Sequence, residues 1–364
     1  MSLTPLFPTP EIVGLSYVVD SISKTASQLV IYTMTTPLGL LSIATAAALV
    51  FGSAAGTANA ATQGQQLRDS LLKWPGVELT KDDGEVRSTV FPALDFTYMD
   101  RLDIKDLVRK DNTRRYEPWG ANNWNCTPSP KHPLPVVMVH GFNTTMGRNW
   151  ALVSPLLVSA GYCVYSLNWG VVDGQEKAGY GPLRQGAAQL SAFVDKVLKS
   201  TGAPRVDIVG HSAGGVMPHW YLHKLGGHKK VRNFFAIAPA TNGTDLFGIA
   251  TNAPKLTDTV VDYVSKEQPA ARDLMPNSSF IRELHSPSPV MPDVNYTVIS
   301  TRYDEMVTPV KSQFLPAGPN VKNYLLQKMC PQAFATHGTM AMHPVVFQLL
   351  ENILGGNTYP IRCI

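Results

Sequence analysis

The sequence has few charged residues for a chain of 364 residues. Asp, Glu, Lys and Arg make up 16% of it, and 31 basic against 27 acidic side chains leave a formal net charge of +4. Disordered chains combine low hydrophobicity with high charge, whereas 44% of this chain is hydrophobic and 9% is aromatic. The small basic excess also argues against nucleic acid as the main partner. The composition therefore indicates a folded protein with one large domain or two ordinary ones.

Cysteine is rare, but the four cysteines form an even set. Cysteines pair as disulfides when a protein leaves the reducing cytoplasm, and four of them allow three pairings. Cys126 lies just before the first core strand expected below, and Cys163 lies inside the next one. Neighbouring parallel strands would bring these two together. We therefore expect the pairs Cys126–Cys163 and Cys330–Cys363.

Charge is wholly absent between Lys24 and Arg68. This stretch contains the apolar run Leu38–Phe51, which is followed by small residues and by Ala58-Asn59-Ala60. An apolar run before an A-x-A sequence is typical of a secretory signal and its cleavage site. We expect residues 1–60 to be a leader cleaved near Ala60-Ala61, and the remaining residues, 61–364, to form one exported domain.

The region before the apolar run differs from an ordinary signal, because it carries Glu11 and Asp20 beside a single Lys24. Translation from Met34 would remove both acidic residues but would leave no basic one. An uncleaved membrane anchor is the alternative, since the uncharged stretch is long enough to span a bilayer. Both arrangements place the rest of the chain outside the cytoplasm.

From Pro133 onward, short apolar runs alternate with segments of helical periodicity. The runs are Pro135–Val139, Tyr162–Leu167, Val206–Val209, Phe234–Ala238, Tyr296–Ser300 and Val321–Leu326. Most are rich in β-branched or aromatic residues, as is typical of strands buried on both faces. Strands alternating with helices predict an α/β fold, with a mostly parallel central sheet and helices on both faces. Residues 241–290 interrupt the alternation, and we expect them to form a small cap or lid.

A serine flanked by glycines follows the third run. The sequence Gly210-x-Ser212-x-Gly214 stands between an expected strand and a helical stretch from Val216 to Leu225. A serine on a sharp strand-to-helix turn has a strained backbone, and side chains two positions away would collide with it. Gly210 and Gly214 remove that collision and expose the hydroxyl. We predict that Ser212 is a catalytic nucleophile.

Acyl transfer at a serine also needs two N–H donors for the oxyanion. One is expected on the residue after the nucleophile, Ala213, and the other in the loop after an earlier strand. The sequence Val139-His140-Gly141-Phe142 fits that loop. We assign the second donor to the backbone of Phe142.

The serine needs a base, and the base needs an orienting carboxylate, in the chain order Ser, acid, His. Asp304 comes a few residues after the run that ends at Ser300, and we favour it as the acid over its neighbour Glu305. His337 lies in a loop between the last run and the last helical segment, which is the expected place of the base.

Two other late histidines fit less well. His285 precedes the acid, and His343 begins the last helical segment beside Pro344, where packing is the expected role. His219 and His223 are four residues apart on a helix, but no H-E-x-x-H sequence accompanies them. No G-K-[ST] follows the glycines around Ser212, which excludes a phosphate loop. We therefore expect no metal and no cofactor.

These motifs resemble those of the secreted bacterial triacylglycerol lipases, class 2 type, of the α/β-hydrolase superfamily. The resemblance covers about two-thirds of the chain, from Trp124 to the C-terminus. The segments that carry it are Asn122–Ser129, His132-Pro133, Val136–Gly141, Gly161–Val164, Leu167-Asn168, Gly210–Gly215, Ala238-Pro239, Asn242–Thr244, Phe280–Arg282, Asp304 and His337-Gly338. The resemblance implies the catalytic set Ser212, Asp304 and His337, lipid-ester substrates and export. The bulky Phe142 after His140-Gly141 resembles the oxyanion loops linked to medium and long acyl chains.

The leading hypothesis is a secreted serine lipase or carboxylesterase that contacts lipid droplets or membranes and has no nucleic-acid partner. An acyltransferase that passes the same acyl group to an alcohol is the first alternative. A non-catalytic cell-envelope protein on a hydrolase scaffold is the second. Apolar residues of the insertion could face the pocket as a lid or could simply pack, namely Leu246, Phe247, Ile249, Val260, Val261 and Val264.

Overall fold

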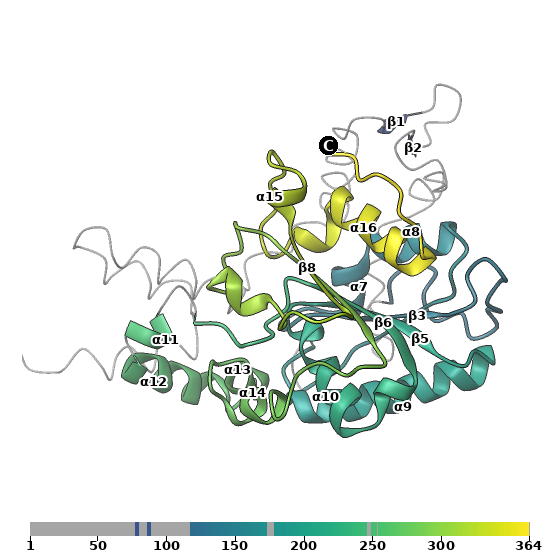
Figure 1. The fold of residues 1–364 in the computed structure, drawn as a ribbon. Coiled ribbons are helices and arrows are strands. Elements are labelled where there is room, and N and C mark those ends of the chain that lie inside the picture. Colours follow the sequence, from purple (N-terminus) through teal and green to yellow (C-terminus); the bar gives the residue numbers. More distant parts are fainter. Residues whose placement is uncertain are drawn as a thin grey trace, which may run out of the picture. The chain divides into compact units, whose positions relative to one another are not determined.

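The computed structural model of the protein, drawn in Figure 1, describes residues 77–79, 86–88, 117–172, 178–245, 249–252 and 254–363. The expected leader, residues 1–60, and its cleavage site near Ala60-Ala61 lie outside the described residues. Among those described, no helix is both long enough and apolar enough to cross a membrane. A short antiparallel pair, β1 (Val77–Leu79) and β2 (Val86–Ser88), precedes the main body of the fold.

A six-stranded, fully parallel sheet forms the centre of the fold, in the strand order β4-β3-β5-β6-β7-β8. The strands are β3 (Val136–Val139), β4 (Val164–Leu167), β5 (Val206–His211), β6 (Val231–Ile237), β7 (Asn295–Ser300) and β8 (Val321–Leu325). Each coincides with one of the apolar runs, to within a few residues at its ends. The expected α/β fold is confirmed.

Helices cover both faces of this sheet, with α9 and α10 on one face and α8 and α16 on the other (Figure 1). The helices before the insertion are α7 (Met146–Trp150), α8 (Val153–Ser159), α9 (Leu183–Thr201) and α10 (Met217–Lys224). Those after the last strand are α15 (Leu326–Met329) and α16 (Pro344–Gly355). Short 3₁₀ turns complete the set: η1 (Ser212–Gly215), η2 (Gly227–Lys229), η3 (Val310–Gln313) and η4 (Met340–Met342).

The alternation of side chains along each strand divides the core into two layers. In β3, Val136 and Met138 belong to the cluster that contains α8 and α16. Val137 and Val139 belong to the cluster that contains α9 and α10. Successive residues of a strand point to opposite faces, and because helices cover both faces of the sheet, all four are fully buried. A strand packed on both faces is therefore largely apolar, and a polar side chain within it is paired, as Asp207 of β5 is with Arg232.

The described part of the insertion between β6 and β7 contains four helices: α11 (Ile249–Asn252), α12 (Pro254–Val264), α13 (Ala270–Asp273) and α14 (Ser279–Leu284). Its second half packs as part of the core, since Ala270, Phe280 and Leu284 are fully buried. The N–H of Ala270 also donates to the carbonyl of Tyr180 at 2.9 Å. Only α11 and α12 remain as candidates for a movable cap. Of the lid residues named above, Leu246 and Phe247 lie outside the described residues.

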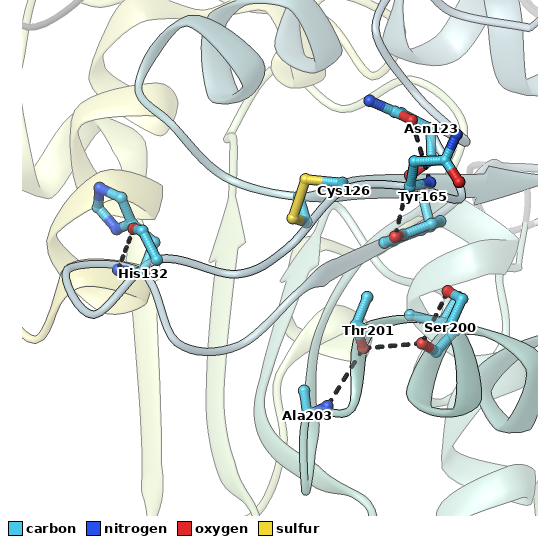
Figure 2. Close-up of a disulfide and its surroundings, with 11 residues drawn as sticks. Asn123, Cys126, His132, Tyr165, Ser200, Thr201 and Ala203 are labelled. Atoms are coloured by element: carbon cyan, nitrogen blue, oxygen red, sulfur yellow. Dashed lines mark hydrogen bonds between the residues drawn. A yellow bond between two sulfur atoms is a disulfide. The ribbon is translucent and has the colours of Figure 1, made fainter.

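Two disulfides join the pairs expected from the sequence. Cys126 is bonded to Cys163 and Cys330 to Cys363, with Cα atoms 5.7 and 5.3 Å apart. Figure 2 shows the first bridge and, beside it, the hydroxyl of Tyr165 donating to the carbonyl of Asn123 at 3.2 Å. This bridge attaches the segment that precedes β3 to the neighbouring strand β4.

Candidate active site

Ser212 stands at the sharp turn between β5 and η1, and its φ angle is +56°. The two glycines of the motif make this turn possible. A Cβ on Gly210 would lie 2.0 Å from the carbonyl oxygen of Gly214, and a Cβ on Gly214 would lie 2.1 Å from the carbonyl oxygen of Val139. Both obstacles are backbone atoms and cannot move aside. The positive φ angle at Ser212 and the requirement for both glycines are the features expected of the nucleophile turn predicted from the sequence.

The loop after β3 lies directly against this serine. A Cβ on Gly141 would lie 3.0 Å from Cβ of Ser212 and 3.5 Å from its Oγ. Phe142 follows in the same loop, and Ala213 follows Ser212 in η1. The geometry thus brings together the two segments whose backbone N–H groups were assigned to the oxyanion.

His140 fixes the start of this loop. Burial lowers the pKa of His140 to about 4, so its imidazole is neutral at pH 7. One ring nitrogen, Nδ1, lies 2.7 Å from the carbonyl oxygen of Gly141, while Nε2 accepts the N–H of Trp169 at 3.3 Å. A neutral ring with its proton on Nδ1 satisfies both contacts. The ring of His140 therefore holds main-chain groups of this loop and of Trp169, and it does not titrate near neutral pH.

Two further side chains hold the same loop, and sequence reasoning did not identify either. Oδ1 of Asn149 accepts the N–H of Gly141 at 3.0 Å. The hydroxyl of Tyr180 donates to Oδ1 of Asn143 at 2.5 Å, and its ring packs edge-on against Phe142. Neither side chain belongs to a recognisable motif, so only the fold reveals them.

Asp304 and His337 are brought together from the loops that follow β7 and β8. Nδ1 of His337 lies 2.9 Å from Oδ2 of Asp304, and both side chains are buried. The imidazole also lies beside the nucleophile turn, since its ring centre is 5.0 Å from that of His211, the residue before Ser212. The three residues expected to form the catalytic set thus all lie in turns or loops that follow the carboxyl ends of the parallel strands.

The carboxylate of Asp304 has a complete set of donors. The main-chain N–H groups of Met306 and Val307 bind Oδ1, at 2.9 and 2.7 Å. Oδ2 accepts Nε2 of Gln313 at 2.9 Å, in addition to His337. Burial by itself would raise the pKa of Asp304, but the charge of His337 and these hydrogen bonds outweigh it and hold the pKa below its usual range. Asp304 is therefore ionised at neutral pH.

Glu305, the alternative acid, has a different contact. Its Oε2 accepts the main-chain N–H of His337 at 2.8 Å, whereas the imidazole Nδ1 is bound by Asp304. On the other side of the base, Nε2 of His211 lies 3.0 Å from the carbonyl oxygen of His337. Burial and the nearby His337 lower the pKa of His211 to about 3, so that ring stays neutral.

The other histidines are bound elsewhere. Nε2 of His285 lies 3.0 Å from the carbonyl oxygen of Thr241, in the insertion. His343 caps α16 by accepting the N–H of Val345 at 3.2 Å. His219 is fully buried and stacks on Tyr296. No group of three or more His, Cys, Asp or Glu side chains suited to a metal ion occurs in the described part of the chain.

Comparison with known proteins agrees with this geometry. The family model for lipase (class 2) matches residues 133–349, which is more than half of the chain. The chain belongs to the class 2 lipase family. The matched region includes every residue assigned above to the nucleophile, the acid, the base and the oxyanion loop.

Solved structures resemble this class 2 lipase in fold. Lipase B of Aspergillus fumigatus is 22% identical, with a TM-score of 0.51 over 63% of this chain and 53% of the fungal chain. The present chain thus spans about half the length of that lipase. Lipase BlEst2 of Bacillus licheniformis in its mature form is 15% identical, with a TM-score of 0.46 over 62% of this chain and 94% of the other. The fold is that of the α/β-hydrolases.

Proposed function

We propose that this class 2 lipase hydrolyses carboxylic esters of lipids through an acyl-enzyme on Ser212. The observation that carries the proposal is the buried Asp304–His337 pair beside a strained, glycine-flanked serine. A general base fixed by an ionised carboxylate next to a nucleophile turn is the arrangement that serine acyl transfer requires.

The mechanism follows from this arrangement. Nε2 of His337 takes the proton of the Ser212 hydroxyl as Oγ attacks the ester carbonyl, and the N–H groups of Phe142 and Ala213 stabilise the oxyanion. His337 then gives that proton to the leaving alcohol. In the second half, His337 deprotonates a water molecule that attacks the acyl-enzyme, and it then gives this proton to Oγ of Ser212 as the bond to the acyl group breaks and the acid leaves. Asp304 holds the imidazole in the required tautomer throughout.

Apolar side chains near the catalytic loops support lipid esters as substrates. Tyr303 precedes the acid and Phe334 lies three residues before the base; they are 43% and 66% exposed, with ring centres 4.8 Å apart. On α12, Val260 and Tyr263 are also exposed. Exposed aromatic residues on loops around a site favour contact with a lipid surface. The two disulfides support function outside the cytoplasm.

A series of nitrophenyl esters of increasing acyl length tests the proposal, with Ser212→Ala as the control. We expect hydrolysis by the wild-type protein and background rates for the variant. Turnover of every ester by Ser212→Ala at the wild-type rate would exclude the mechanism.

Two further assays test the finer parts of the proposal. With a dilute alcohol present, free acid should be the main product, and dominant ester exchange would identify an acyltransferase instead. Emulsified triacylglycerol should be hydrolysed faster than the same ester in solution. Equal rates in both would exclude the proposed contact with a lipid surface.

A further inference from the structure

Side chains, rather than a sheet, hold the main chain around the base. His337 lies between α15 and η4, in a segment that contains no strand. Upstream of it, buried side chains bind the carbonyl groups of Ala333 and Ala335. The peptide groups of His337 itself have contacts on two sides: its N–H donates to Oε2 of Glu305, and its carbonyl oxygen lies 3.0 Å from Nε2 of His211. These two contacts hold the main chain of His337, while the bond from Nδ1 to Asp304 holds its ring.

The position of Glu305 in the chain suits it to hold the main chain of His337. It directly follows Asp304, whose carboxylate is fixed by two main-chain N–H groups, so the two acidic side chains share one short, well-held loop. Asp304 binds the ring of His337, and Glu305 binds its backbone at 2.8 Å. One loop thus sets both the direction of the ring and the location of its Cα atom.

The remaining hydrogen bonds around the base lie within its own loop: the N–H groups of Thr339 and Met340 donate to the carbonyl of Thr336, and Oγ1 of Thr339 accepts the N–H of Thr336 at 2.9 Å. A Cβ built on Gly338, the next residue, meets nothing within 4 Å, so there is open space on that side of the backbone. Without an acceptor, the half-buried N–H of His337 would turn towards water, because a buried N–H group without a partner is costly. The loop would then shift and carry the imidazole with it.

We propose that Glu305 is a positioning residue of this enzyme, which places His337 for proton transfer by binding its main-chain N–H. The inference rests on the proposed function, since it concerns the base of that mechanism. Glu305 does not touch the substrate. It acts on the chemical steps, because small displacements of a general base cost far more in rate than in substrate binding.

Two substitutions separate this role from a general effect on folding. In Glu305→Leu the acceptor is lost, and we expect kcat to fall by about 10- to 100-fold. KM should stay within about two-fold, since ground-state binding does not use the base. Glu305→Gln retains an amide oxygen in the same place, and we expect it to recover most of that loss. For both variants, kcat and KM are measured on a soluble nitrophenyl ester, and thermal unfolding is followed in parallel.

Glu283→Leu is the matched control. Glu283 also accepts a hydrogen bond at 2.8 Å, from Arg184, but it lies on α14, away from the catalytic loops. It should leave kcat unchanged. A wild-type kcat for Glu305→Leu, or an equal loss of kcat for Glu305→Gln and Glu305→Leu, would overturn the inference. In either case a background rate for Ser212→Ala in the same assay would show that the proposed function itself still holds.

Discussion

Nε2 of Gln313 donates to Oδ2 of Asp304 at 2.9 Å, deep enough that neither side chain reaches solvent. Oδ2 is the same oxygen that binds the imidazole of His337. Gln313 therefore shares with the base the stabilisation of a buried negative charge. A buried carboxylate is tolerated only when its lone pairs are bound in this way.

Replacing Gln313 by Leu should weaken both stability and catalysis. Hydrogen bonds to charged groups contribute about 1.5–3 kcal/mol, so the free energy of unfolding should fall by about that amount. We also expect kcat to fall by about ten-fold, because Asp304 would hold the imidazole less firmly. Urea unfolding and steady-state kinetics measure the two effects. Wild-type values in both would show that Gln313 does not support Asp304.

Gly214→Ala should prevent the nucleophile turn from forming. The new methyl group would lie 2.1 Å from the carbonyl oxygen of Val139 and 2.4 Å from that of His140. Because these are backbone atoms, we expect a loss of about 3 kcal/mol or more and no activity. Gly338→Ala is the control, since its methyl group meets nothing within 4 Å beside His337. Equal melting temperatures for the two variants would contradict this account of the turn.

Stability should decrease in acid through the buried histidines. Burial, assisted by the nearby His223, lowers the pKa of His219 from 6.5 to about 3, so below pH 6.5 the unfolded chain binds a proton that the folded protein does not. Stability is then lost as the pH falls from 6.5 towards 3. At pH 4 this one residue should account for about 3 kcal/mol.

His219→Phe tests this directly. The slope of unfolding free energy against pH, between pH 6.5 and 4, should decrease by the contribution of one proton, about 1.4 kcal/mol per pH unit. Denaturant unfolding at a series of pH values measures the slope. Parallel curves for the variant and the wild type would mean that His219 titrates normally in the folded protein.

The two disulfides should differ in their effect on activity. Their sequence separations are 33 and 37 residues, so loss of either should lower stability by about 3–4 kcal/mol. Cys330–Cys363 is next to the segment that carries the base, whereas Cys126–Cys163 fastens the start of the core. We expect Cys330→Ala/Cys363→Ala to lose kcat as well.

The matched variant for that comparison is Cys126→Ala/Cys163→Ala. It should retain the wild-type kcat at temperatures where both proteins remain folded. The same kcat in the two double variants would show that the C-terminal bridge has no influence on the base.

The sequence was sufficient to predict the sheet and the positions of the main catalytic candidates, for identifiable reasons. A strand buried on both faces is largely apolar, and a nucleophile turn carries glycines, so β5 and Ser212 can be recognised from adjacent residues in the sequence. Asp304 and His337 could be found because the chain order of such a set is restricted. The apolar runs and the glycines depend on neighbours within a few residues, whereas the candidate acid and base were assigned from their order along the chain.

The supporting contacts could not be predicted, because they join distant segments. Gln313 meets Asp304, Tyr180 meets Asn143 and Asn149 meets Gly141 only once the loops are packed. A single Gln, Tyr or Asn belongs to no spaced motif, so nothing in the sequence indicates its supporting role. The insertion is a second example. Its apolar residues were compatible with either a lid or core packing, and only the structure shows that α14 packs into the core.

Covalent labelling of the nucleophile tests the central claim most directly. A nitrophenyl phosphonate ester should add one phosphonyl group per chain, and peptide mapping by mass spectrometry should place it on Ser212. Labelling should vanish in Ser212→Ala and slow markedly in His337→Ala, because the base activates the hydroxyl. A wild-type protein that remains unlabelled and inactive, or one labelled at another residue with loss of activity, would contradict the account.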